Sequence, residues 1–187
     1  MRMSLRHSLS ELLELIDQPN RAGCESLYQK NKELFDRARG SKTKHQAWEG
    51  GYLDLVIETC NIGLVLYDTM SALRPLPFTK SDVVLVMYLH DLEKPWKHVR
   101  QEDTWKDTAE LGVKSHAKAF VLRKAREFGI ILTPEQENAL LYVEGENESY
   151  DPNKRVMNEL GALCHSADIL SARLWYNYPR QDDLSKA

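Results

Sequence analysis

His90 and Asp91 are adjacent in the sequence, and they directly follow its most apolar segment, residues 83–89. Burying an ionised aspartate costs several kcal/mol unless a cation or hydrogen bonds compensate for it. Neighbouring side chains on a helix point about 100° apart, so this pair could bind one cation only at the end or flank of a helix. The pair therefore indicates a metal site at a helix end. The alternative is a polar last turn, where His90 is favourable near the negative end of the helix dipole.

The pair belongs to an ordered set of three segments. They are His45-Gln-Ala-Trp-Glu-Gly-Gly-Tyr-Leu-Asp-Leu55, Tyr88-Leu-His-Asp-Leu-Glu-Lys-Pro95 and His165-Ser-Ala-Asp-Ile-Leu-Ser-Ala-Arg173. This set resembles the HD-domain phosphohydrolase superfamily over about residues 45–173. It is most similar to the branch that carries an H-x-A-x-x-G-G-x-L motif before the metal helix, which includes HD-type 3′–5′ exoribonucleases and many small phage-encoded HD proteins.

The resemblance implies a divalent metal ion as cofactor. It assigns His90 and Asp91 as the central ligands and Asp168, 77 residues after Asp91, as the closing one. In members with two metals, the additional positions correspond to His116 and Glu144. Imidazole and carboxylate ligands suit Mn²⁺, Fe²⁺, Zn²⁺ or Mg²⁺ alike, so the residue types do not select among these ions. The alternatives are that Asp168 is a surface helix residue and His116 an ordinary residue of a first helical turn.

One ligand position departs from the family pattern. The family's first ligand is a histidine four residues after the Gly50-Gly51 pair, and here that residue is Leu55, 35 residues before His90. Leucine cannot bind a metal. Losing a residue that merely orients a ligand costs about 10–100-fold in metal affinity, so losing a ligand should cost at least as much. The plainer interpretation is that Leu55 is simply a core residue.

The resemblance also implies which residues contact the substrate. Lys94 matches the lysine of the family's H-D-x-x-K variant, which approaches a phosphate oxygen, and Lys97 adds positive charge. His45 occupies a position near the substrate, where it could bind phosphate or replace the missing ligand. His165 lies one turn before Asp168 on the same helix face and could also reach the site. The alternative for the two lysines is a solvated helix end. The residues expected to act in catalysis are Asp91, Lys94 and His45.

These assignments imply a metal-dependent phosphohydrolase that acts on a phosphate ester of a nucleotide or a short oligonucleotide end. The alternative is a catalytically impaired HD-fold protein that binds a nucleotide or phosphate ligand without turnover, and a structural or interaction protein is a third hypothesis. The sequence contains no P-loop, Rossmann fingerprint or GxSxG elbow that would indicate a different chemistry.

The elements that must position these residues are helical. Apolar residues recur at spacings of three and four nearly throughout the chain, which predicts an all-α, compact HD-type bundle in a single domain. We expect its core over about residues 45–176, with a helical N-terminal extension over residues 1–40. The predicted helices cover residues 9–16, 27–38, 48–70, 79–93, 115–128, 133–143 and 154–176. Residues 96–114 are weakly patterned and predict a loop or a short exposed helix.

Local signals support several of these boundaries. Thr79 with Asp82 resembles a capping box, and Thr133-Pro134-Glu135-Gln136 combines an N-cap, a proline at the first helical position and the closing residue of a box. Glycines inside the helix predicted over residues 48–70 each cost about 1 kcal/mol relative to alanine. The pair of glycines at its start therefore requires a reason, and close packing or ligand approach is the usual one.

Composition narrows the class of protein. The 187 residues suit one domain, and 42% hydrophobic with 28% charged residues is typical of a soluble globular protein. The net charge of −3 provides no broad positive field, so we expect a small-molecule partner and no duplex nucleic acid. Three widely spaced cysteines fit a reducing cytoplasm. We expect no signal peptide and no membrane span, and the sequence is compatible with a homo-oligomer.

Overall fold

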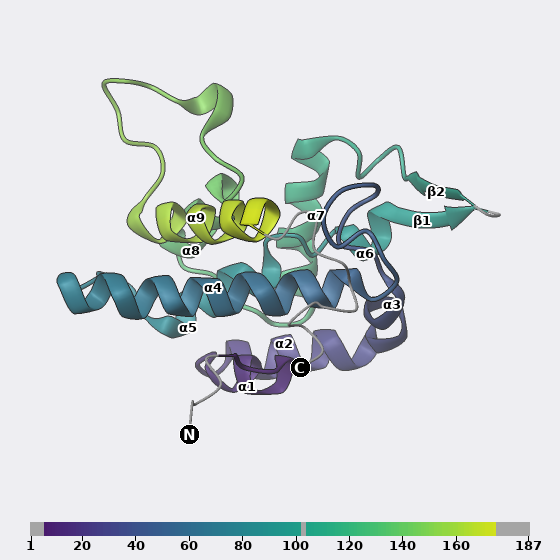
Figure 1. The fold of residues 1–187 in the computed structure, drawn as a ribbon, viewed down its shortest axis with the longest axis horizontal. Helices are drawn as coiled ribbons and strands as arrows, with labels where there is room; N and C mark the ends of the chain where they lie inside the picture. The colour runs from purple at the N-terminus through teal and green to yellow at the C-terminus, as the bar shows by residue number, and fades with distance from the viewer. Residues whose placement is uncertain (1–5, 102–103, 175–187) are drawn as a thin grey trace.

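The computed structural model describes residues 6–101 and 104–174, and over these residues the chain is mostly helical (Figure 1). The helices are α1 (Leu9–Glu14), α2 (Asn20–Lys30), α3 (Lys32–Arg37), α4 (Gly51–Leu73), α5 (Lys80–Leu89), α6 (Lys94–Lys97), α7 (Lys114–Glu127), α8 (Pro134–Tyr142), the 3₁₀ turn η1 (Asn147–Ser149) and α9 (Glu159–Leu174). Every described helix is too short or too polar to span a bilayer.

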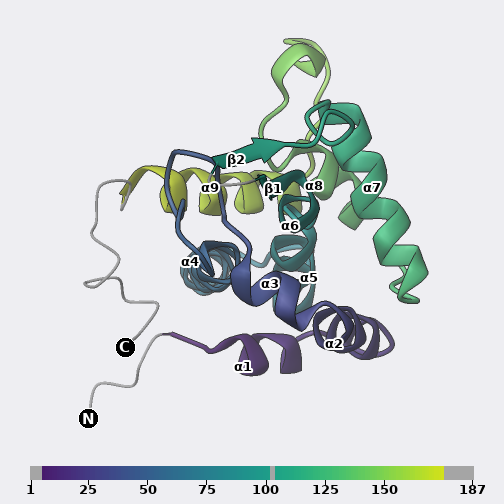
Figure 2. The same cartoon turned by 90° about the vertical axis from the view of Figure 1, so that its right-hand side faces the viewer.

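The long helix α4 forms the middle of the molecule. Figures 1 and 2 show α9 on one side of it, α1 and α2 on the opposite side, and α5 beside it. The helix α9 packs against α4, α5 and α8, so segments far apart in the sequence meet around α5. The prediction of a mainly helical fold is confirmed.

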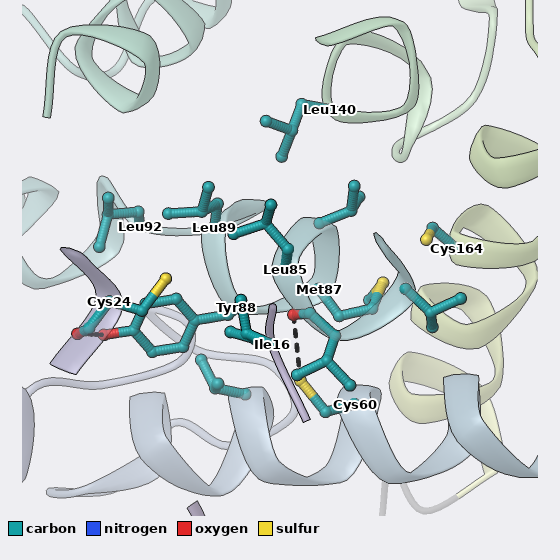
Figure 3. Packing of buried hydrophobic residues seen from close by; sticks show 14 of the residues in the cluster. Ile16, Cys24, Cys60, Leu85, Met87, Tyr88, Leu89, Leu92, Leu140 and Cys164 are labelled. Atoms are coloured by element: carbon teal, nitrogen blue, oxygen red, sulfur yellow. Dashed lines mark hydrogen bonds between the residues drawn. The ribbon is translucent and has the colours of Figure 1, made fainter. Parts of the chain in front are cut away.

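Helix α5 is the centre of the hydrophobic core, and residues 83–89 are all buried. Figure 3 shows its side chains between α4 and α9. The Tyr88 hydroxyl donates to the carbonyl of Cys24 at 3.1 Å, and the Cys60 thiol donates to the carbonyl of Val84 at 3.9 Å. The apolar segment is therefore the buried helix that the sequence predicts, and these two contacts connect it to α2 and α4.

The stretch expected as a loop or short helix contains a β-hairpin instead. Strands β1 (His98–Gln101) and β2 (Thr104–Asp107) pair antiparallel, with His98 opposite Asp107. The hairpin extends from the body of the molecule in Figure 1. Its strands are short and mostly exposed, so they lack the alternation of apolar and polar residues that identifies a strand in a sequence. The expectation for residues 96–114 is wrong at this point.

Both capping boxes are confirmed, since the Thr79 and Thr133 side chains accept from the backbone three residues on. Several boundaries differ from the prediction. The helix expected over residues 27–38 is two helices that meet at Asn31, and the helix expected from residue 48 begins at Gly51. Helix α9 begins five residues later than predicted because the Asn158 side chain accepts from the backbone amide of Gly161 at 2.7 Å. The predicted end of that helix, at residue 176, lies outside the described residues.

Candidate metal centre

His90 and Asp91 follow directly after the last residue of α5, and both are buried. The His90 ring is oriented by the backbone: its Nδ1 lies 2.6 Å from the carbonyl oxygen of Met87. A carbonyl can only accept, so Nδ1 carries the hydrogen and the neutral ring has its lone pair on Nε2. This is the arrangement that second-sphere hydrogen bonds impose on metal-binding histidines.

The Nε2 atom of His90 faces two carboxylates. It lies 3.1 Å from Asp91 Oδ2 and 3.7 Å from Asp168 Oδ1, a residue of α9. This nitrogen is buried and makes no hydrogen bond of good geometry within the described chain. A buried polar atom with no such partner is costly, so its position between two carboxylates calls for a cation or a proton there.

His90, Asp91 and Asp168 form a group that could hold a metal ion. One donor atom from each residue lies within 4.8 Å of the others. A cation bound at about 2.1 Å from nitrogen and oxygen donors requires those donors to lie about 3 to 3.5 Å apart, which the observed separations approach. Among the described residues this is the sole group of three or more such side chains that meets the distance condition. The resemblance described above implies the same three ligands.

Lys94 lies beside the same carboxylate. Its Nζ atom is 2.7 Å from Asp91 Oδ2, and both side chains are largely buried. Burial alone would raise the pKa of Asp91, but the charges of Lys94 and His90 outweigh it and hold that pKa well below its usual range. Burial likewise opposes the charged form of Lys94, yet Asp91 outweighs it and raises the pKa of Lys94. Both groups are therefore ionised at neutral pH.

The pKa values of two neighbouring buried groups, His90 and Glu93, are also shifted. Burial lowers the pKa of His90, but the Asp91 and Asp168 carboxylates outweigh it and raise the pKa to about 10. Burial and the nearby Asp91 charge raise the pKa of Glu93 to about 7. Without a metal, the histidine is therefore the group that carries the proton between the carboxylates.

His45 lies beside the cluster, on the segment between α3 and α4. That segment arches up next to α6 and the hairpin in Figures 1 and 2. Burial, followed by the charge of Lys94, lowers the pKa of His45, while Asp168 and Asp91 act in the opposite direction. A neutral ring next to these three charges can donate a hydrogen bond. It does not supply the positive charge that a protonated histidine would.

The paired glycines at the start of α4 are explained by close packing around Gln46. The amide of Gly40 donates to the Gln46 carbonyl at 2.9 Å, and a Cβ atom at Gly51 would lie 2.1 Å from that carbonyl oxygen. Gly50 has a φ of 81°, which favours glycine. The glycines thus allow the chain to fold back tightly and present His45 next to the cluster.

Glu58 connects this segment to α9. The Gln46 side chain donates to Glu58 Oε1 at 2.9 Å, and the hydroxyl of Ser171, one turn after Asp168, donates to the same oxygen. Sequence reasoning did not identify these two hydrogen bonds to Glu58. The available signal was the spacing, because Glu58 lies one turn after Leu55 on α4 and Ser171 one turn after Asp168 on α9.

Leu55 is fully buried on α4. Its helix neighbours Tyr52 and Val56 belong to the main hydrophobic cluster, whereas Leu55 is not a member of that cluster. The Tyr52 hydroxyl, one turn earlier on the same face, is buried without a hydrogen-bond partner in the described chain. Burial, followed by the charges of Asp91 and Glu93, raises the pKa of this hydroxyl. Leu55 is thus an apolar residue on a helix face that is polar one turn away. Sequence reasoning did not identify Tyr52 or Glu93.

The other predicted residues lie outside the group of three. Glu144 forms an ion pair with Lys114 at 2.8 Å, and His116 is exposed on α7. His165 Nδ1 lies 2.7 Å from the carbonyl of Val143, which ties α9 to the end of α8. These contacts give His116 and Glu144 no shared cation position with His90, so a second metal remains a prediction.

Lys97 is half-buried one turn after Lys94. Its positive charge acts to lower the pKa of the buried Glu93 and of the buried His98. It does not reach the carboxylates as Lys94 does. Its predicted contact with a substrate phosphate therefore remains a prediction.

Comparison of this chain with known protein families, with curated proteins and with solved structures finds no match.

Proposed function

We propose that this protein is an HD-type, metal-dependent phosphohydrolase that acts on a phosphate ester of a nucleotide or a short oligonucleotide end. The observation that carries the proposal is the buried His90 Nε2, which faces the carboxylates of Asp91 and Asp168 with no hydrogen bond of its own. The order of the motifs supports the HD assignment, and the donor set suits Mn²⁺, Fe²⁺, Zn²⁺ or Mg²⁺.

Each residue of the cluster has a role in this reaction. His90, Asp91 and Asp168 would hold the cation, which supplies Lewis-acid chemistry by lowering the pKa of the attacking water and stabilising charge on the phosphate. The oxygen of water bonds to phosphorus, the ester P–O bond breaks, and the leaving oxygen takes up the proton that the water loses. Lys94 places a positive charge beside Asp91, where it can offset the charge of the phosphate oxygens. His45, neutral at physiological pH, donates a hydrogen bond to the substrate.

The test is phosphate or nucleotide release from nucleoside mono-, di- and triphosphates, cyclic dinucleotides and short oligonucleotides with Mn²⁺. The matched variants are Asp91→Ala and Asp36→Ala, because Asp36 is an exposed aspartate of α3 that pairs with Lys32. We expect turnover that is lost in Asp91→Ala and kept in Asp36→Ala. Turnover that survives in Asp91→Ala, or no turnover of any substrate, would overturn the proposal.

A second function, ligand binding without turnover, rests on Leu55. The leucine at the first-ligand position removes an imidazole that the HD resemblance expects. A binding protein of this kind is stabilised by a nucleotide with no effect of Mn²⁺, whereas the hydrolase is stabilised by Mn²⁺ itself, since a ligand of the native state raises the melting temperature by mass action. Thermal unfolding with each addition separates the two.

A further inference from the structure

Asp91 Oδ2 is shared by two cationic groups. Lys94 Nζ lies 2.7 Å from this oxygen and His90 Nε2 lies 3.1 Å from it. The same oxygen is the Asp91 donor nearest to the histidine, so it is the atom through which Asp91 would bind a metal together with His90. The ammonium of Lys94 thus contacts the donor that a cation needs.

A divalent cation and the ammonium cannot both remain at this oxygen at low cost. Bound at about 2.1 Å from Oδ2, the cation would lie within a few ångströms of Nζ. Like charges at such separations repel strongly where water is largely excluded, as it is around side chains with 15% and 7% exposure. Lysine has a flexible four-carbon stem, and this remaining exposure leaves the ammonium a direction in which to move.

We propose that Lys94 competes with the metal for Asp91, so that metal binding releases its ammonium to an anionic ligand. This inference rests on the proposed function, because it concerns the same metal centre. The released ammonium stays near His45 and His98, since both rings already lie within range of the Lys94 charge. Metal and phosphate then bind cooperatively: each one favours the arrangement in which Lys94 has left Asp91.

The test measures Mn²⁺ affinity directly, from the electron paramagnetic resonance signal of free Mn²⁺, and does not depend on turnover. The variants are Lys94→Met, which keeps the length of the side chain, and Lys94→Gln, which keeps a neutral donor to Asp91. Lys97→Met is the matched control, since it removes the same charge one turn later on α6. Asp91→Ala reports whether Mn²⁺ binds at this centre.

We expect Lys94→Met and Lys94→Gln to bind Mn²⁺ at least about tenfold more tightly than the parent, because the metal no longer has to break a buried ion pair. Lys97→Met should stay within about threefold of the parent, which separates competition from a general loss of positive charge. Sulfate, used as the anion probe, should tighten Mn²⁺ binding by the parent more than by Lys94→Met.

Equal or weaker Mn²⁺ binding by both Lys94 variants overturns the inference. If Asp91→Ala still abolishes Mn²⁺ binding in that case, the metal centre stands and the competition alone is refuted. Equal tightening by Lys94→Met and Lys97→Met would also overturn it, since a general charge effect would then be sufficient. If neither the parent nor any variant binds Mn²⁺, the inference fails together with the metal-dependent function.

Discussion

Replacement of Leu55 by histidine should convert an apolar position into a metal ligand. Leu55 is fully buried but is not a member of the main hydrophobic cluster, so the change leaves the side chains of that cluster in place. Without metal, the lost apolar burial and the desolvated imidazole together cost about 2–4 kcal/mol. For a chain of this length, that lowers the melting temperature by about 2–4 °C for each kcal/mol.

With Mn²⁺, part of this loss should be recovered. An additional imidazole ligand that tightens binding by at least about tenfold adds about 1.4 kcal/mol to the stabilisation at saturating metal. The rise in melting temperature between EDTA and saturating Mn²⁺ should then be about 3–6 °C larger in Leu55→His than in the parent. Turnover, where present, should rise in the same variant.

The assay is thermal unfolding followed by circular dichroism, in EDTA and across an Mn²⁺ series. Leu64→His is the matched control, because Leu64 lies on the same helix and belongs to the main cluster. It should lose stability in EDTA without gaining a larger response to Mn²⁺. An identical Mn²⁺-dependent shift in Leu55→His and the parent would show that position 55 does not face the metal.

Two further changes test the packing and the charges around the cluster. Gly51→Ala should cost about 1–3 kcal/mol in urea unfolding, because its Cβ would lie 2.1 Å from the Gln46 carbonyl. Gly112→Ala, with its nearest atom at 3.4 Å, should cost far less, and equal losses would contradict the packing argument. Glu93 has a folded pKa of about 7, above its ordinary 4.5, so its contribution to stability is fully present below pH 4.5 and is lost as the pH rises through 7. In EDTA, Glu93→Gln should therefore exceed the parent in stability by up to about 3 kcal/mol at pH 8 and by little at pH 5. A difference independent of pH would refute this assignment.

The features that local sequence signals specify were predictable. The Thr79 and Thr133 capping boxes involve residues three positions apart, so their geometry is encoded within one turn. The buried helix α5 follows from an uninterrupted apolar run next to such a box. The hairpin over residues 98–107 was not predictable in this way, because its stability comes from the ladder and from contacts such as His98 with Asp107 at 2.8 Å.

The candidate site was predictable only in part. His90 and Asp91 are adjacent, and their position after an apolar helix indicates a buried polar pair. Asp168 is 77 residues away, and only the resemblance connected it to them before α9 was seen to pack against α5. Spacing places Glu58 one turn after Leu55 and Ser171 one turn after Asp168, but it does not show that Glu58 bonds to Gln46 and Ser171, since these bonds depend on how two helices and a loop meet.

Glu58 connects two segments that lie far apart in the sequence to the same point of α4. One oxygen of its carboxylate accepts from both the Gln46 side chain and the Ser171 hydroxyl. Removal of this carboxylate in Glu58→Ala should therefore lower the opening free energy, measured by native-state hydrogen exchange, of both the Gly40 amide, which donates to Gln46, and the amides in the last turns of α9. The order of the segment that carries His45 and of the helix end that carries Asp168 would then depend on a single side chain of α4.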